Sequence, residues 1–277
     1  MKKILIIILT IFLITGNNDY QELNDLSIIS SIYIDYQNNN YLVYFQSQNP
    51  NQNNNEFIIY KTNANTIEQA FNNILEKTPN VPYYKHLEVL FISESIAIDH
   101  LPKIINYFQN TNNTRNEFNI LINKNNNPNI INIPSTTIKN IIKTNTNYIG
   151  ISQNLTFNDL LDNYLNPYKE ITIPSIEIEN NNEIKLSTIA IFDNNKLIKY
   201  LTEEENIIFN IINNNIKRTT IKNNYNNSKY YVIKINYIKS KLKLNTKNNT
   251  LNINIKGKYN IKENTTNNII NYNTINN

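Results

Sequence analysis

Asparagine sets the strongest limit on what this chain can fold into, because it must form nearly all of the tight turns. The 277 residues include 63 Asn and 52 Ile, but only three Gly and eight Pro. Asparagine adopts positive φ more readily than most residues with a side chain. We therefore expect Asn clusters, such as those at 37–40 and 193–195, to close hairpins between Ile-rich strands. The abundant residues have codons rich in A and T, so genome base composition is the simplest reason for the excess.

Composition also excludes several kinds of active site. Glycines at 16, 150 and 257 are too few and too far apart for a phosphate-cradling loop or a dinucleotide fingerprint. The absence of cysteine removes disulfides, thiolate metal sites and cysteine nucleophiles. The two histidines, His86 and His100, leave little for zinc or triad chemistry, and we expect a structural or turn position for His86 and a surface position for His100. The sequence therefore predicts no catalytic residue, no metal site and no cofactor.

The first sixteen residues have the features of an export signal. Positions 1–3 are basic, positions 4–14 are apolar with one exception, and polar residues follow Gly16. As a helix this run would reach about 20 Å, short of the roughly 30 Å hydrocarbon core of a bilayer. No pair of small residues suited to signal peptidase precedes Asn17. We expect residues 1–16 to remain as an anchor and the rest of the chain to lie on the extracytoplasmic face of a membrane.

The body of the chain alternates between strands and amphipathic helices. This pattern predicts an α+β fold in which helices pack on mixed β-sheets. The predicted strands are 27–34, 41–46, 57–61, 87–93, 118–122, 171–179, 186–192 and 197–201, with 87–93 central in the sheet. The predicted helices are 67–75, 99–109, 138–142, 157–165 and a last one that begins after Thr202. Thr202 and Glu205 form a capping box there, and the expected buried stripe is Ile207, Ile208, Ile211 and Ile212.

A change of charge divides the sequence. Residues 1–216 carry a net charge of −7, whereas residues 217–277 carry +11. We predict an N-terminal domain at 17–216, which could contain two subdomains, and a partial, strand-rich C-terminal domain at 217–263. An Asn-rich linker is expected at 223–228, and a disordered tail at 264–277.

The basic C-terminal strands, predicted at 230–244 and 250–261, indicate a contact surface. Their alternating pattern places lysines on one side of the sheet. The candidate contact residues are Lys234, Lys239, Lys241, Lys243, Lys256 and Lys258. Each lysine near an anionic lipid surface contributes on the order of 1 kcal/mol, so a membrane or an acidic partner subunit would suit this side. Lysines that prevent aggregation between strand edges explain the pattern equally well. Nucleic acid is not an expected partner, because export places it in another compartment.

The acidic clusters have structural explanations. Asp19, Glu22 and Asp25 could hold a divalent cation, but they lack the ordered oxygen-ligand loop with its Gly turn. The acids at 203–205 could act as an acid–base cluster, but helix capping explains them without any chemistry.

Several short blocks, each weak alone, occur in a fixed order along the chain. They lie at 16–26 (GNNDYQELNDL), 34–35, 48–50, 66–71, 86–94 (HLEVLFISE), 189–193, 200–205 (YLTEEE) and 238–241. Together these blocks resemble the spore germination lipoproteins of the GerAC type. The resemblance extends from residue 16 to about residue 262.

The resemblance implies a role in spore germination rather than a reaction. It implies a non-enzymatic C subunit of a nutrient-germinant receptor at the spore inner membrane, which acts by contact with the A and B membrane subunits. An alternative from another class is an extracytoplasmic small-molecule-binding protein, which would need a deep cleft with a few convergent polar groups. An exported hydrolase is a third possibility, but the sequence shows no plausible nucleophile–base pair.

Two features depart from the family pattern. Asn17 and Asn18 stand where the family has its lipid-bearing cysteine and the tryptophan after it. An amide side chain cannot form the thioether to diacylglycerol, so the resemblance implies no lipid attachment at Asn17 and anchoring by the N-terminal segment instead. The C-terminal domain is also expected to be truncated relative to the family.

Overall fold

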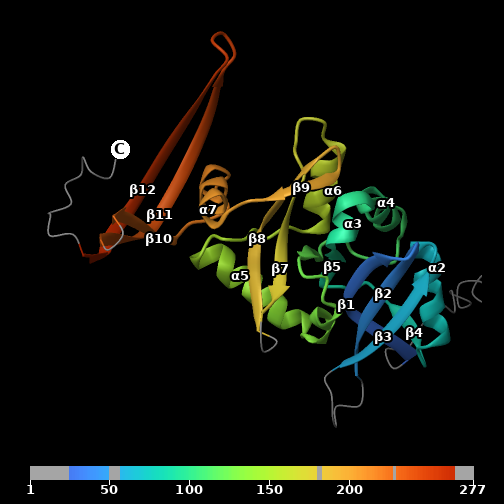
Figure 1. Ribbon diagram of the computed structural model, residues 1–277. Coiled ribbons are helices and arrows are strands. Elements are labelled where there is room, and N and C mark those ends of the chain that lie inside the picture. Colours follow the sequence, from blue (N-terminus) through green and yellow to red (C-terminus); the bar gives the residue numbers. More distant parts are fainter. Residues whose placement is uncertain (1–24, 50–56, 180–182, 227–228, 266–277) are drawn as a thin grey trace, which may run out of the picture.

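The computed structural model describes residues 25–49, 57–179, 183–226 and 229–265 (Figure 1). The predicted signal at 1–16, Asn17 and nearly all of the predicted tail lie outside these ranges. Within them, no helix combines the length and the apolar character that crossing a membrane requires.

A nine-stranded mixed sheet forms the body of the molecule and, with its helices, confirms the predicted α+β class. The strand order is β3-β2-β1-β5-β6-β7-β8-β9, with β4 paired to β1. Strands β1, β5, β6 and β7 run parallel at the centre, and β2, β3, β8 and β9 add antiparallel strands outside them. The bounds are β1 Leu26–Gln37, β2 Asn40–Gln48, β3 Phe57–Ala64, β4 Val81–Tyr83, β5 Val89–Ser93, β6 Asn119–Asn123, β7 Thr172–Ile178, β8 Ile184–Asp193 and β9 Lys196–Tyr200.

Helices cover both faces of this sheet. One apolar core lies between the sheet and helices α2, α3, α4 and α6, and a second lies under α5 and the adjacent 3₁₀ helix. Strand β5 contributes Leu90 to the first core and Phe91 to the second, so every residue of β5 is buried and its predicted central position is confirmed. The helices are α2 Ile67–Asn72, α3 Glu94–Asp99, α4 Leu101–Asn110, α5 Ser135–Tyr148, α6 Phe157–Leu165 and α7 Glu203–Ile212, with 3₁₀ helices η2 Asn73–Glu76 and η3 Pro128–Asn132.

Asparagine forms the tight turns, as predicted. The β1–β2 turn has φ of 49° at Asn38 and 62° at Asn39, and the β8–β9 turn has 48° at Asn194 and 65° at Asn195. Two consecutive positive φ angles suit the right-handed twist of a hairpin. Every non-glycine residue with positive φ in the described ranges is an asparagine.

The helix predictions are correct in position but less accurate in length. Helix α6 has the predicted bounds, α5 is much longer than the predicted 138–142, and α3 was not predicted. Leu75, expected on the buried face after α2, is exposed. The chain tightens to a 3₁₀ helix after Asn72, and its three-residue turn rotates Leu75 away from the core.

The buried side of α7 differs from the predicted isoleucine stripe. Ile208 is exposed, whereas Asn206 and Asn210 are fully buried. Asn206 accepts a hydrogen bond from the amide of Ile189 on β8 and donates one to the carbonyl of Ile151. The helix therefore packs through amides that satisfy backbone groups of an adjacent loop and strand. The predicted capping box of Thr202 and Glu205 is confirmed.

A second, three-stranded antiparallel sheet follows α7. It comprises β10 Thr219–Asn226, β11 Lys229–Asn245 and β12 Thr250–Asn264, in that order. The predicted linker at 223–228 is wrong over 223–226, which belong to β10. Because β10 pairs with β11 only up to Ile235, the rest of β11 and β12 is a two-stranded hairpin that extends away from the large sheet (Figure 1).

Candidate functional site

The distal β11–β12 hairpin has one basic side, which we call the lysine face. Lys239 lies directly opposite Lys256, and Lys241 and Lys243 follow at the two-residue spacing that keeps side chains on one side of a strand. A bulge in β11 between Ile235 and Tyr237 brings Lys234, at the base of the hairpin where β10 still pairs with β11, to the same side. The lysine face therefore comprises all six lysines that the sequence predicted: Lys234, Lys239, Lys241, Lys243, Lys256 and Lys258.

The lysine face carries positive charge without a neighbouring acid. Four of its lysines, with Tyr237 and two asparagines, line a shallow hollow of about 550 Å³. No carboxylate in the part of the chain that the structure describes forms an ion pair with these lysines. Like charges directly opposite each other destabilise a strand pair, and Lys239 and Lys256 lie opposite each other in this way. An external anionic surface would relieve this repulsion.

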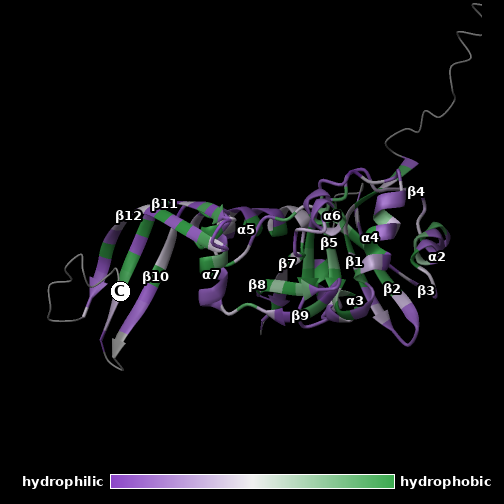
Figure 2. Ribbon diagram, turned by 90° about the horizontal axis from the view of Figure 1, so that it is seen from above, coloured by the Kyte–Doolittle hydropathy of each residue, from purple (hydrophilic) through white to green (hydrophobic). Residues whose placement is uncertain are grey.

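The reverse side of the same hairpin is apolar, and we call it the aliphatic face. It comprises Leu242, Leu244, Leu251, Ile253 and Ile255. These side chains are between 45% and 68% exposed, unlike the isoleucines of the central strands β5 and β6, which are fully buried. Figure 2 shows the alternating hydrophilic and hydrophobic bands along β11 and β12. Contiguous exposed apolar surface is typical of an interaction site.

The sequence analysis did not identify the aliphatic face, although the sequence carries its signal. Leu242 and Leu244 alternate with lysines in β11, and the three aliphatic residues of β12 alternate with asparagines at the same two-residue spacing. Along an antiparallel strand at the protein surface, apolar residues that face the core normally alternate with polar residues that face solvent. What the pattern does not reveal is that nothing in the described ranges covers the apolar side.

The base of the hairpin is fixed to α7. Ile238 packs against Ile211 and Ile216 in a small apolar cluster. Asn214, just after α7, donates from Nδ2 to the carbonyl of Ser240 at 3.1 Å and accepts from its amide at 2.7 Å. The two faces are therefore presented on a positioned element rather than on a loop.

The structure does not gather the other polar candidates into a site. His86 is exposed, and its ring centroid lies 5.6 Å from that of Tyr83. His100, expected on the surface, is partly buried 3.8 Å from the ring of Tyr36, and burial lowers the pKa of its imidazole. The described residues contain no group of three or more potential metal-ligating side chains.

The acidic candidates have separate positions and structural roles. Of the acids at 19–25, only Asp25 is described by the structure. Glu205 accepts a hydrogen bond from the amide of Thr202 and forms an ion pair with Lys199 at 3.2 Å. The backbone hydrogen bond, followed by the contact with Lys199, lowers the pKa of Glu205. Glu205 therefore acts as a helix cap.

Comparison with known proteins places the chain in a family. Residues 19–178 match the spore germination protein N-terminal domain, and residues 187–277 match the family described as spore germination B3/GerAC like, C-terminal. These matches define the chain as a spore germination protein. It belongs to the GerAC family, which confirms the resemblance read from its sequence.

The chain is similar to a solved structure titled as the crystal structure of the GerBC protein, with 17% identity, a TM-score of 0.48, and coverage of 85% of this chain and 73% of that one. No curated protein matches the chain in sequence.

Proposed function

We propose that the chain is a C-type subunit of a nutrient-germinant receptor on the extracytoplasmic face of the spore inner membrane. It acts without catalysis, through contacts with the A and B membrane subunits. The observation that carries this proposal is membership of the GerAC family over 19–178 and 187–277. Residues 1–16 would supply the anchor, because Asn17 cannot carry a thioether-linked lipid.

The receptor role is testable in spores. Deletion of the gene is expected to slow germination with at least one nutrient while leaving a nutrient-independent trigger unaffected, and a tagged copy should recover the A and B subunits from spore membranes. Unchanged germination on every nutrient, together with a tagged copy that recovers neither subunit, would contradict the proposal.

Within this role, the distal hairpin is the proposed contact with an anionic lipid surface. A bilayer interface suits both of its faces at once. Amphipathic segments lie with their apolar side about 5–10 Å into the boundary between headgroups and acyl chains. With the aliphatic face at that depth, the lysine face lies in the phosphate layer, where lysine is favoured.

Protection of a strand edge, the alternative left open by the sequence, accounts for the lysines alone. It gives no reason for five aliphatic side chains that are at least 45% exposed on the reverse side. An acidic partner subunit would account for the lysine face, and the test below includes it as an outcome.

The test compares two sets of four substitutions. Both sets are made in the full chain, so that the N-terminal apolar segment contributes equally to membrane binding in each. One set replaces Lys239, Lys241, Lys243 and Lys256 with Gln. The matched control replaces four exposed lysines elsewhere: Lys85, Lys103, Lys143 and Lys169. Flotation with vesicles containing phosphatidylglycerol, and with neutral phosphatidylcholine vesicles, measures binding at low and high salt.

The lysine-face set should lose most of the preference for anionic vesicles, since four lysines at about 1 kcal/mol each amount to more than a hundredfold in affinity before screening. The control set should keep this preference. Equal behaviour of the two sets would overturn the membrane contact. If the lysine-face set kept vesicle binding but lost recovery of the A or B subunit, an acidic protein partner would replace the membrane.

A further inference from the structure

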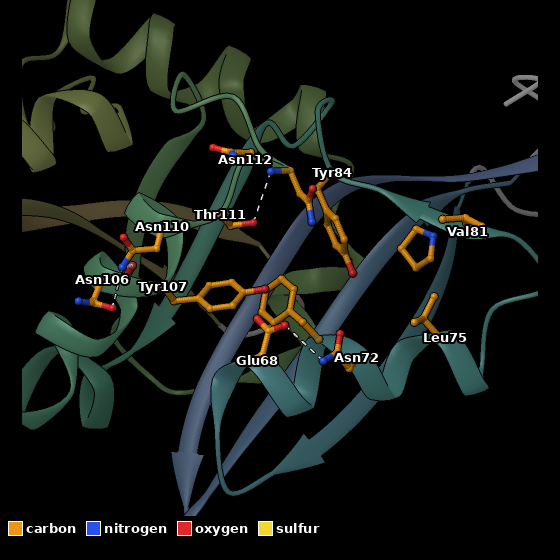
Figure 3. Close-up of a pocket in the computed structure, with 13 residues that line it drawn as sticks. Glu68, Asn72, Leu75, Val81, Tyr84, Asn106, Tyr107, Asn110, Thr111 and Asn112 are labelled. Atoms are coloured by element: carbon orange, nitrogen blue, oxygen red, sulfur yellow. Dashed lines mark hydrogen bonds between the residues drawn. The ribbon is translucent and has the colours of Figure 1, made fainter. Parts of the chain in front are cut away.

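A cavity lies in the large sheet domain, away from the hairpin, and the proposed function makes no use of it. It has a volume of about 600 Å³ and is bordered by α2, the segment around β4, and α4 with the loop that follows it (Figures 1 and 3). This volume is within the range of cavities that hold small molecules.

Aromatic rings form one wall of this cavity. Phe71 of α2 lies between Tyr84, which follows β4, and Tyr107 of α4. The ring centroid of Phe71 is 5.6 Å from that of Tyr84 and 4.7 Å from that of Tyr107. The faces of aromatic rings carry partial negative charge and attract cations.

The charge of the cavity comes from one residue. Glu68 is the only charged side chain among its lining residues, and it is exposed to solvent. Because Glu68 and Phe71 are three residues apart on α2, they share a face of the helix. Asn72 holds the carboxylate by donating from Nδ2 to Oε1 at 3.3 Å, and no lysine or arginine of the described ranges forms an ion pair with Glu68 (Figure 3).

The tyrosine hydroxyls remain neutral beside this carboxylate. Burial, and then the negative charge of Glu68, raise the pKa of both Tyr84 and Tyr107. The two phenols are therefore neutral hydrogen-bonding groups at the cavity, and they do not add a second negative charge.

Amide side chains complete the rim. Asn106 and Asn110 are hydrogen-bonded to each other on α4, at 3.0 Å between Nδ2 of Asn110 and Oδ1 of Asn106, and Asn112 and Asn113 follow in the next loop. The rim therefore offers hydrogen-bond donors and acceptors without adding charge.

We propose that this cavity binds a small organic cation, an ammonium or quaternary ammonium compound. The aromatic wall takes the cationic head by cation–π attraction, Glu68 neutralises its charge, and the asparagine rim bonds a polar group of the same molecule. A metal ion does not fit, because one carboxylate is too few charged oxygen ligands. An anion does not fit, because Glu68 would repel it.

The test uses choline and its neutral carbon isostere, 3,3-dimethylbutan-1-ol, which has the same shape but no charge. The full chain is held in a maltoside detergent, since phosphocholine detergents would present a quaternary ammonium group themselves. Ligand-observed NMR titration gives the two dissociation constants. The dissociation constant of choline should be at least about fivefold lower than that of the isostere. It should lie in the millimolar range, as expected for an exposed cation–π site.

Variants identify the residues responsible. Glu68→Gln should weaken choline binding about fivefold and leave binding of the isostere unchanged. Glu76→Gln is the matched control, because it removes the same charge from an exposed residue of the adjacent η2 that does not line the cavity. Tyr107→Leu should weaken choline binding by a similar factor, with thermal unfolding measured to show that the fold is kept.

Equal affinity for choline and the isostere would overturn the proposal. So would no detectable binding of choline at about 50 mM, or an equal loss in the Glu68→Gln and Glu76→Gln variants. None of these results bears on the hairpin or on germination, so the cavity and the proposed function fail independently.

Discussion

The large sheet and the distal hairpin are built from similar strand sequences but differ in what surrounds them. In the large sheet, β5 is buried on both sides by helices. The β11–β12 hairpin alternates isoleucine and leucine with lysine and asparagine, and both of its sides are exposed along most of its length. The comparison shows that an apolar strand pattern identifies a surface that needs a partner. Whether that partner is the chain's own helix depends on contacts distant in sequence.

The test of this contrast with the largest expected effect substitutes one apolar side chain in each region. Phe91→Ala in β5 leaves a void in a fully buried position and should cost about 4 kcal/mol of unfolding free energy. Leu244→Ala on the aliphatic face should change it by about 0.5 kcal/mol or less, because Leu244 is 68% exposed. Denaturant unfolding measures both values. A large cost for Leu244→Ala would mean that the aliphatic face is already covered within the protein.

A second test concerns α7, which packs on β8 of the large sheet and on β11 of the hairpin. Asn206→Ala leaves the amide of Ile189 and the carbonyl of Ile151 without their partner and should cost about 3 kcal/mol. The matched control is Asn213→Ala at the exposed end of the same helix, where the expected cost is about 0.5 kcal/mol or less. Similar losses in the two variants would show that α7 does not depend on its buried amides.

Much of the large sheet could be predicted because its signals are local. Asn38 and Asn39 indicate a turn without reference to any other part of the chain. The continuous apolar run of β5 places apolar side chains on both faces of the strand, so β5 must lie in the centre of the sheet. The buried face of α7 could not be predicted, because Asn206 is buried only where distant backbone groups need an amide. The hydrophobicity of the side chains favours burial of Ile208 instead of Asn206.

Of the two candidate sites, the lysine face could largely be predicted from the sequence and the cavity could not. The lysine face follows from a two-residue period, except for Lys234, which the bulge near Tyr237 adds. The cavity could not be predicted, because Glu68, Tyr84 and Tyr107 come from three separate segments and no local pattern links them.

The smallest expected effect lies at the start of α7, next to β9 of the large sheet. Hydrogen bonding lowers the pKa of Glu205 below its ordinary 4.5, so its ionised form stabilises the folded state. That contribution is present above pH 4.5 and is lost as the pH falls through the lowered pKa. Glu205→Gln keeps a capping side chain without the charge, so its stability should approach that of the unmodified protein as the pH falls.

The matched control is Glu204→Gln, which removes the same charge from an exposed neighbour outside the capping box. Unfolding midpoints are measured between about pH 7 and pH 3. The midpoint of Glu205→Gln should approach that of the unmodified protein as the pH falls, whereas that of Glu204→Gln should not. If both variants converge equally with the unmodified protein, general charge at the helix N-terminus, rather than the hydrogen bond to Thr202, supports the helix that joins the large sheet to the hairpin.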